Sequence, residues 1–233
     1  MKHIVVTGGA KGIGRAIVEN LTTGDYKITA TYNDSKEAAA ELAKKYPNVQ
    51  FVKVDLQDRA AVAKCIQELS KLGPIDVLVN NAGLYVGKPF AKMTEAELLQ
   101  QADLNFTSLA QLTHGLLPVL REAKAPLIIN VSSQAVHDHL TGEAMYTAAK
   151  AAVSMLSQVL RAELNPEGIR VTTVEPYGVN TYGIPEPSDM ILPEELARTV
   201  CYAIELPDHL QLDTIGMSHI NQARPDYPEH IEK

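Results

Sequence analysis

The sequence has few of the residues and patterns that mark secreted, metal-binding or membrane proteins. Only two cysteines, Cys65 and Cys201, occur in 233 residues. Neither has a CxxC partner or a histidine at ligand spacing, so we expect reduced packing residues and no metal. The longest apolar runs, such as Leu127–Ile129, are too short to span a bilayer. A strand-like run follows Met1 directly and leaves no room for a signal peptide. These features predict a cytoplasmic protein without a membrane partner.

Positive charge is also in short supply. The chain has 21 Lys and Arg against 28 Asp and Glu, for a formal net charge of −7, and no basic block. This balance argues against nucleic acid as a partner. Apolar residues make up 45% and charged residues 21%, which excludes a disordered chain. A mass of 25.3 kDa lies at the upper end of what one domain holds.

Short apolar runs alternate with longer amphipathic segments along the chain. The strand-like runs are His3–Thr7, Lys27–Tyr32, Val49–Val54, Asp76–Asn80, Leu127–Val131, Ile169–Val174 and, more weakly, Leu210–Met217. The helix-like segments are Ile13–Thr23, Lys36–Lys45, Arg59–Leu72, Glu95–Arg121, Glu143–Leu164 and Pro193–Glu205. Nearly continuous apolar strands are typical of a parallel sheet covered on both faces. The pattern predicts a single α/β domain over residues 1–219, a Rossmann-type doubly wound parallel sheet of about seven strands, and a surface tail over 220–233.

A glycine-rich turn, TGGAKGIG, follows the first strand and precedes a helix. Gly8 permits a tight turn, Gly12 lets phosphates approach the backbone, and Gly14 allows close helix packing. The helix start presents unpaired N–H groups and a positive dipole end, which suit a pyrophosphate. Such turns also occur for geometry alone, but this position favours nucleotide binding.

Tyr146 and Lys150 form a Tyr-x-x-x-Lys pair inside an Ala-rich helical segment, so both project from one helix face. Chance supplies about half of one such pair in this chain. A second pair, Tyr32 and Lys36, runs off the end of a strand, where no common face is assured. Context therefore favours the Tyr146–Lys150 pair.

Polar residues gather where the predicted strands end. Ser133 lies thirteen residues before Tyr146 and just after a strand, so its hydroxyl is expected in the ligand crevice. Its neighbour Ser132 is the rival, but a structural hydrogen bond suits it better. Asp55 and the NNAG segment follow two other strands. Asn105 lies within a helical segment, where function and simple exposure remain equally open.

Jointly, these motifs resemble the classical short-chain dehydrogenase/reductase family, from Ile4 to about Met217. The resemblance implies Asn105, Ser133, Tyr146 and Lys150 as the catalytic tetrad. It implies that Asp55 and Leu56 hold the adenine and that Asn81, Ala82 and Gly83 line the cofactor cleft. The complete set expected to bind cofactor is Gly8, Lys11, Gly12, Ile13, Gly14, Asn33, Asp55, Leu56, Asn81, Ala82, Gly83, Tyr146, Lys150, Pro176, Val179 and Thr181. The chain departs from the family at Tyr177, where glycine is common, and this ring is expected to narrow the pocket.

The implied reaction passes a hydride between nicotinamide and a carbonyl carbon, with Tyr146 as acid/base. Lowering a phenol from its usual pKa of about 10 to near 7 takes about 4 kcal/mol. A Lys150 ammonium roughly 4 Å away supplies about this much at an effective dielectric near 20. Lys150 also suits the ribose hydroxyls. Ser133 would bind the substrate oxygen, and Asn105 would hold a water that relays protons to Lys150.

The choice between NADP and NAD depends on the end of the second strand. No acid stands at Thr31 or Tyr32 to bind a ribose 2′-hydroxyl, although Asp34 follows two residues later. Lys11 offers a cation for a 2′-phosphate. The sequence therefore favours NADP over NAD.

The C-terminal part is similar to NADP-dependent 3-hydroxy acid (serine) dehydrogenases, which implies a small 3-hydroxy acid or keto compound as substrate. Two alternatives are a 3-oxoacyl carrier-protein reductase and a catalytically idle, NADP-sensing regulator. Relatives commonly pair the helix that carries Tyr146, so a homodimer or homotetramer is expected.

Overall fold

Seven parallel strands form a central sheet in the order β3-β2-β1-β4-β5-β6-β7. The strands are β1 (Lys2–Val6), β2 (Tyr26–Tyr32), β3 (Val49–Lys53), β4 (Val77–Asn80), β5 (Leu127–Val131), β6 (Arg170–Pro176) and β7 (Thr214–Met217). The computed structural model describes residues 1–138, 140–181, 183–184 and 189–222. Most of the expected surface tail, residues 223–233, lies outside this range. The doubly wound parallel sheet predicted from the strand–helix alternation is confirmed.

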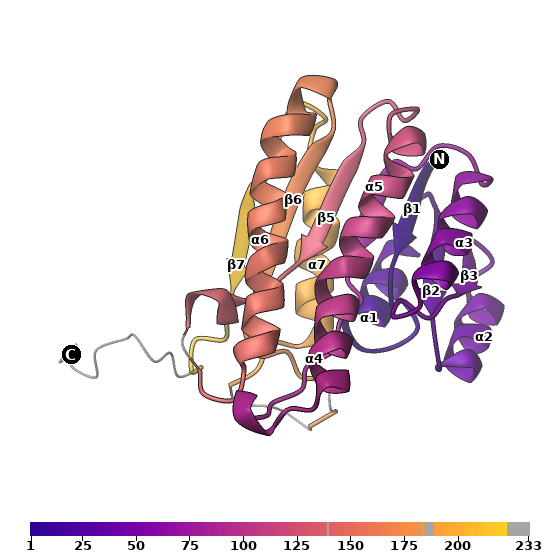
Figure 1. Cartoon of the computed structure of the whole chain (residues 1–233). Helices are drawn as coiled ribbons and strands as arrows, with labels where there is room; N and C mark the ends of the chain where they lie inside the picture. Colours follow the sequence, from indigo (N-terminus) through magenta and orange to yellow (C-terminus); the bar gives the residue numbers. More distant parts are fainter. Residues whose placement is uncertain (139, 182, 185–188, 223–233) are drawn as a thin grey trace.

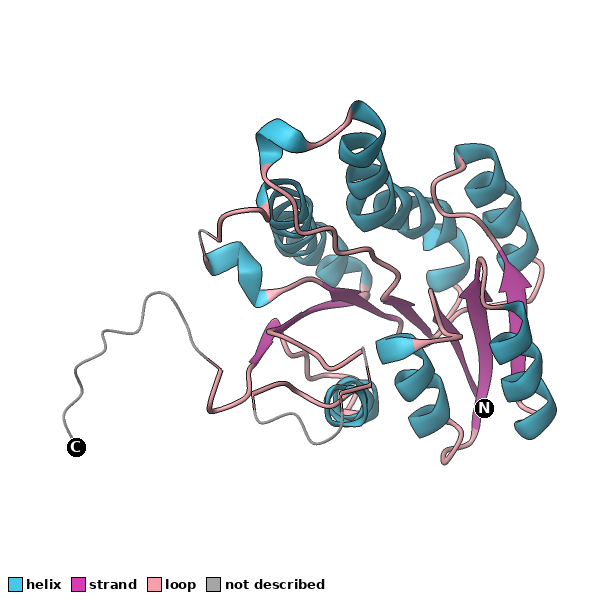
Figure 2. Ribbon diagram, turned by 90° about the horizontal axis from the view of Figure 1, so that it is seen from below, coloured by secondary structure: helices cyan, strands magenta, loops and turns pink. Residues whose placement is uncertain are grey.

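Helices cover both faces of the sheet (Figures 1 and 2). One face carries α1 (Gly12–Leu21), α2 (Lys36–Lys45) and α7 (Pro193–Glu205), and the other carries α3 (Arg59–Ser70), α4 (Glu95–Ala102), α5 (Ser108–Leu120) and α6 (Ala144–Leu164). Four short helical turns are η1 (Phe90–Lys92), η2 (Asp103–Thr107), η3 (Gln134–His137) and η4 (Asn165–Glu167). Because β4 pairs with β1, the chain reverses its direction of winding between these two strands. In such sheets the ligand crevice opens at this point, outside the carboxyl ends of the strands.

The apolar core has two halves, one on each face of the sheet. Ile4 and Val6 of β1 pack into the half beneath α1 and α7, whereas Val5 between them packs with α3 and α5. All three side chains are fully buried. Successive strand residues point to opposite faces, so a strand covered on both faces must be apolar throughout. This explains why the strand-like runs do not alternate with polar residues.

A buried polar chain crosses the middle of the sheet. The Asn80 amide nitrogen donates to Thr113 Oγ1 at 2.9 Å and to Asn130 Oδ1 at 2.8 Å. The Asn130 amide nitrogen in turn donates to Ser157 Oγ at 2.9 Å. Asn80, the first residue of the NNAG segment, thus ties β4 to β5 and α5. Its side chain belongs to the scaffold, because buried amides need such partners.

Two predicted elements differ from the structure. The segment Glu95–Arg121 is not one continuous helix, because a π-helical turn at Asp103–Thr107 separates α4 from α5. The last strand begins at Thr214 and not at Leu210. The side-chain oxygen of Gln211 accepts the Val171 N–H at 2.9 Å, so a side chain takes the place of strand pairing there.

Candidate active site

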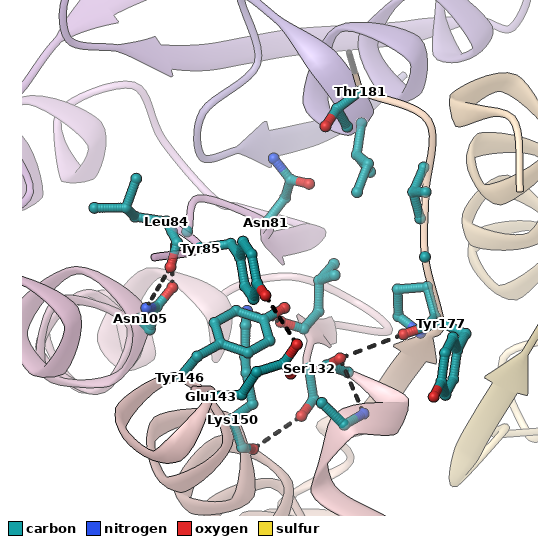
Figure 3. A pocket seen from close by; sticks show the side chains of 18 of the residues that line it. Asn81, Leu84, Tyr85, Asn105, Ser132, Glu143, Tyr146, Lys150, Tyr177 and Thr181 are labelled. Carbon is teal, nitrogen blue, oxygen red and sulfur yellow. Dashed lines mark hydrogen bonds between the residues drawn. The ribbon is translucent and has the colours of Figure 1, made fainter. Parts of the chain in front are cut away.

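The predicted site residues come together at the carboxyl ends of the strands. A cavity of about 500 Å³ opens there, between the β1 and β4 turns on one side and the segment after β6 on the other. Of the predicted residues, it is lined by Ile13, Asn81, Gly83, Asn105, Ser133, Tyr146, Lys150, Pro176, Val179 and Thr181. Figure 3 shows these elements converging on the cavity. The remaining predicted residues do not line it: Gly12 and Gly14 lie in the first turn of α1, and Gly8, Lys11, Asn33, Asp55, Leu56 and Ala82 lie in the turns after β1, β2, β3 and β4.

The glycine-rich turn adopts the backbone that its glycines were expected to allow. Gly8 and Gly12 have φ angles of 67° and 54°, in the left-handed region that disfavours other residues. Lys11 occupies the N-cap of α1 and supplies no side-chain hydrogen bond to the helix. The first N–H groups of α1 therefore lack the cap that Ser, Thr, Asp or Asn would provide. An uncapped, dipole-positive helix end at a glycine turn is suited to an anionic phosphate.

Gly14 is required by a contact within the turn itself, whereas the sequence analysis predicted that it allows the helix to pack on the sheet. A Cβ atom at Gly14 would lie 2.2 Å from the Gly8 carbonyl oxygen and 2.6 Å from the Asn81 side-chain nitrogen. The contact with the sheet is made instead by Gly9, where a Cβ would lie 2.6 Å from the Ala30 Cβ. Gly14 thus allows the turn to fold onto itself, and Gly9 allows it to lie against β2.

Thr7 and Asn81 join the glycine turn to the turn after β4. Thr7 Oγ1 accepts the backbone N–H groups of Asn81 at 2.9 Å and Ala82 at 3.0 Å. The Asn81 amide nitrogen returns a bond to the Thr7 carbonyl oxygen at 2.9 Å. These bonds lock the two turns that flank the winding reversal. The predicted cleft residues Asn81 and Ala82 are therefore held by the same contacts that hold the glycine turn.

Tyr146 and Lys150 project from α6 toward the cavity, as their i, i+4 spacing predicts. The Lys150 amine lies 5.9 Å from the centroid of the Tyr146 ring and donates to the Val131 carbonyl oxygen at 2.8 Å. The Lys150 side chain is buried, and this desolvation lowers its pKa to about 8. A lysine with this pKa is still mostly an ammonium at neutral pH. The competing pair, Tyr32 and Lys36, lies outside the cavity, at the end of β2 and the start of α2.

The two adjacent serines have different partners. Ser132 Oγ donates to the Lys150 carbonyl oxygen at 2.9 Å and lies 2.8 Å from Ser154 Oγ, which ties the end of β5 to α6. Ser133 Oγ accepts the Ala135 N–H at 3.1 Å and has only a long 3.5 Å contact to the Pro176 carbonyl oxygen as donor. The Ser133 hydroxyl is therefore the one whose proton is less committed to the fold.

Asn105 is buried, which removes the alternative that it simply faces solvent. It lies in the π-helical turn, where such bulges often mark functional sites. Its side chain accepts the Leu84 N–H and donates to the Leu84 carbonyl oxygen, both at 2.8 Å. A Cβ atom at Gly83 would lie 2.9 Å from Asn105 Oδ1 and 3.4 Å from the Lys150 amine. Asn105 thus fixes the loop after β4 against the catalytic candidates.

Tyr85 and Glu143 are among the cavity residues that the sequence analysis missed. The Tyr85 hydroxyl donates to Glu143 Oε1 at 2.9 Å, and the Tyr85 ring meets the Tyr146 ring edge-on at a centroid distance of 5.2 Å. Figure 3 shows Tyr85, Glu143 and Tyr146 grouped at one wall of the cavity. An acid three residues before Tyr146 on a helical segment was the available signal for Glu143. Nothing in the sequence places Tyr85 beside it.

The segment after β6 forms the opposite wall. Tyr177 lines the cavity as expected, and in the view of Figure 3 its ring lies to the right, away from Tyr146. Val179 makes a bridge with Ile191, and the Asn180 side chain bonds the backbone of Ile184 in both directions. These contacts hold Val179 and Thr181 near the glycine turn, where a Cβ at Gly12 would lie 3.4 Å from the Thr181 methyl carbon.

Both cysteines are buried and unpaired, in α3 and α7, as packing residues would be. Among the described residues there is no group of three or more His, Cys, Asp or Glu side chains placed to hold a metal ion. Over the same ranges, no helix combines the length and apolar character needed to cross a membrane.

Comparisons with known proteins agree with the site. Residues 2–188 match the family model for short chain dehydrogenases. A serine 3-dehydrogenase of Rhizobium radiobacter is 31% identical over 239 residues, covering 94% of each chain. An L-xylulose reductase of Bos taurus is 35% identical over 181 residues, covering 77% of this chain and 72% of that protein.

Solved structures with a similar fold include two serine dehydrogenases. Serine dehydrogenase from Escherichia coli superposes with a TM-score of 0.85 at 29% identity, over 95% of this chain and 100% of that chain. The closed form of a serine dehydrogenase complexed with NADP⁺ superposes with a TM-score of 0.88 at 27% identity, over 99% of this chain and 100% of that chain. The resemblance found in the sequence is thereby confirmed. The chain belongs to the short-chain dehydrogenase family and is an oxidoreductase that acts on CH–OH groups with a nicotinamide cofactor.

Proposed function

We propose that the protein transfers a hydride between NADP and a carbonyl or secondary alcohol compound, with Tyr146 as the acid/base. One observation carries this proposal: Tyr146 and Lys150 of α6 and Ser133 after β5 line a single cavity beside the glycine turn. These groups come from distant parts of the chain, and no packing need would place all three around one cavity.

The residues present fit a dinucleotide. The uncapped start of α1 at Gly12 and Ile13 would hold the pyrophosphate, with Gly12 allowing the phosphates to approach and Gly8 and Gly14 allowing the turn to fold. Asp55, Leu56 and Asn33 would hold the adenosine half, and Asn81, Ala82 and Gly83 would border the ribose and the ring. Pro176, Val179 and Thr181 would cover the nicotinamide from the opposite wall. Lys150, with its buried amine, would bind the ribose hydroxyls.

The chemistry needs a proton at the substrate oxygen while the nicotinamide, when bound, gives or takes the hydride. Tyr146 supplies that proton from its hydroxyl, or removes it in the reverse direction. The Lys150 ammonium favours the ionised phenol by its charge. The Ser133 hydroxyl donates to the substrate oxygen, where negative charge develops. Asn105 positions the loop of Gly83 and Leu84. It would also hold a water that relays protons to Lys150.

NADP is favoured over NAD by the charges at the adenosine end. Lys11 is exposed at the N-cap of α1 and is free of any ion pair among the described residues. The last residues of β2 are Thr31 and Tyr32, neither of which is an acid that could bind a ribose hydroxyl. Thr31 is buried and accepts the Gly8 N–H. The similarity to a serine dehydrogenase complexed with NADP⁺ supports the same choice.

The relatives support a small hydroxy compound or its keto partner as substrate. The serine 3-dehydrogenases point to a 3-hydroxy acid, and the L-xylulose reductases point to a hydroxylated ketone. The carrier-protein reductase and the idle sensor are not favoured by these similarities.

The test is single-turnover hydride transfer with NADPH or NADH over a panel of small carbonyl compounds, measured for the parent, Tyr146→Phe and the matched control Tyr32→Phe. Tyr146→Phe should retain cofactor affinity and lose at least about 10²-fold in rate. Tyr32→Phe should transfer hydride at nearly the parent rate. A Tyr146→Phe enzyme with the parent rate would refute the acid/base assignment.

We further propose a homodimer or homotetramer in the cytoplasm. The outer surface of α6 exposes Met155 and Val159, apolar side chains that a partner helix would cover. The two buried, unpaired cysteines are consistent with a reducing compartment. Light scattering that shows only a 25.3 kDa species at micromolar concentration would contradict the oligomer.

A further inference from the structure

Glu143 places a carboxylate in the wall of the cavity, close to the proposed acid/base. It lies at the N-cap of α6, three residues before Tyr146, and residues at this spacing share a helix face. Both Glu143 and Tyr146 line the cavity. Figure 3 shows the Glu143 carboxylate beside the Tyr146 ring. A substrate whose oxygen reaches Tyr146 must therefore present its neighbouring groups to Glu143.

The position of this carboxylate is fixed by its surroundings. Tyr85 donates to Glu143 Oε1 at 2.9 Å, and the Tyr85 ring packs edge-on against Tyr146. The preceding Gly142 has a φ angle of 88°, and its carbonyl oxygen accepts the Lys88 N–H at 2.7 Å. An ionised carboxylate accepts about four hydrogen bonds, so Glu143 can accept further donors from a ligand beyond the one from Tyr85.

The charges around the cavity are unfavourable to a substrate carboxylate. Within the lining that the structure describes, Glu143 is the one acid and Lys150 the one base. The Lys150 amine is buried and donates to the Val131 carbonyl oxygen. Two nearby basic side chains bind other acids: Lys88 bonds both oxygens of Glu97 at 2.8 Å, and His137 bonds Glu175 at 2.9 Å.

The sequence of the wall after β6 adds to this balance. In the described part of this segment, residues 177–181, 183–184 and 189–197, there is no Lys, Arg or His, and the acids are Asp189, Glu194 and Glu195. A carboxylate bound here would face the Glu143 charge, and the described lining offers it no cationic side chain other than the buried Lys150 amine, which disfavours binding. Hydroxyl and ammonium groups would instead donate to Glu143.

We propose that Glu143 is a specificity-determining residue that selects small hydroxy or keto compounds carrying a hydrogen-bond donor, a hydroxyl or an ammonium group, one or two carbons from the reacting carbon, and that rejects compounds with a carboxylate two carbons away. This inference rests on the proposed function and narrows its substrate. It separates the two classes suggested by the relatives, in favour of polyol-like or amino-alcohol compounds over 3-hydroxy acids.

The test uses two pairs of three-carbon compounds in which a carboxylate replaces a CH₂OH group: L-serine against serinol, and 3-hydroxypropionate against 1,3-propanediol. Oxidation is measured with saturating NADP⁺, and binding to the NADP⁺-loaded enzyme is measured by calorimetry. The member of each pair that lacks a carboxylate should have the higher kcat/KM and the tighter binding, by about 10- to 100-fold for like charges within one cavity. Preference for serinol over 1,3-propanediol would identify ammonium as the better donor, and equal use would identify hydroxyl; both outcomes support a donor site.

Glu143→Gln keeps the shape of the side chain and removes its charge. It should reduce the preference for the member of each pair that lacks a carboxylate by about 10-fold or more. The matched control is Glu163→Gln, an exposed acid near the far end of the same helix, which should retain the parent preference.

Two results would overturn the inference: tighter or equal binding of the carboxylate compounds by the parent, including no measurable binding of any, or an unchanged preference in Glu143→Gln. Arg224 lies outside the described residues, so Arg224→Gln is included; carboxylate binding that disappears in this variant would also overturn it. Failure of the proposed function is distinct, because then no compound would reduce NADP⁺ while the binding comparison would still report on Glu143.

Discussion

Lys150 donates a 2.8 Å hydrogen bond from its buried amine to the backbone carbonyl oxygen of Val131, two residues before Ser133. This bond connects α6, which carries the proposed acid/base, to the end of β5. The burial that makes this contact possible also lowers the pKa of the amine to about 8. The Lys150 side chain therefore belongs to the proposed active site and, because its charge is buried, lowers the free energy of unfolding.

Replacing this lysine should stabilise the protein while it abolishes activity. Between its folded pKa of about 8 and its ordinary value of 10.5, the unfolded chain binds more protons than the folded one, so the free energy of unfolding rises with pH over this window. Below it, the full cost of burying the charge applies. Lys150→Met should thus gain up to about 3 kcal/mol at pH 7, and the gain should shrink as pH rises to 10.

Urea unfolding at pH 7 and at pH 9.5 measures this difference, with the exposed Lys64→Met as control. A gain in Lys150→Met that does not change with pH would mean that burial of the charge is not the cause.

Substitution of the two adjacent serines should affect different properties: stability at Ser132 and the rate of hydride transfer at Ser133. Ser132→Ala removes buried bonds to the Lys150 carbonyl and to Ser154, and should lower the free energy of unfolding by about 1–2 kcal/mol. Ser133→Ala removes weaker contacts and should mainly lower the rate of hydride transfer. Thermal unfolding and single-turnover kinetics on both variants check this. If Ser132→Ala loses more rate than Ser133→Ala, the two roles are reversed.

Cofactor preference should depend on Lys11. We expect the parent to bind NADPH more tightly than NADH, because Lys11 offers a cation to the 2′-phosphate. Lys11→Ala should weaken NADPH by about 1–2 kcal/mol and leave NADH nearly unchanged. Fluorescence titration of both cofactors measures the four affinities. Equal losses of affinity for the two cofactors would show that Lys11 does not contact the 2′-phosphate.

Gly14→Ala should disrupt the glycine turn. Its Cβ would lie 2.2 Å from the Gly8 carbonyl oxygen, a distance that forces the backbone to move. We expect a loss of about 1–3 kcal/mol in unfolding free energy together with weaker cofactor binding. Gly73→Ala is the control for cofactor binding: its positive φ makes alanine strained there, so stability should also fall, but cofactor affinity should not, because Gly73 lies outside the glycine turn. Unchanged cofactor affinity in Gly14→Ala would argue against a role of this turn in binding.

The sheet and most of the cavity were predictable because their signals are local. Apolar runs, the glycine turn and the Tyr146–Lys150 spacing each report on a few neighbouring residues. The π-helical turn at Asn105 was not predictable in this way, because its residues are as compatible with an ordinary helix and its side chain bonds Leu84, in a distant loop. The contact between Tyr85 and Glu143 depends on the same long-range arrangement.

The start of the last strand was missed for a related reason. Leu210 and Leu212 give this segment the alternating pattern of a strand. The Gln211 side-chain oxygen, however, accepts the Val171 N–H that a strand backbone would otherwise accept. Such a substitution of side chain for backbone depends on how two segments meet. Composition and periodicity contain no information about it.

The uncapped start of α1 has a consequence for the lifetime of the protein in a cell. On the proposed binding mode, the cofactor phosphate would satisfy the N–H groups of this helix end and so become part of the folded structure. At a free cofactor concentration 100 times the dissociation constant, binding adds about 2.7 kcal/mol to the free energy of unfolding. Proteases act on the opened chain, so the rate of degradation should fall as the cofactor pool fills. The abundance of this enzyme would then follow the supply of its own cofactor.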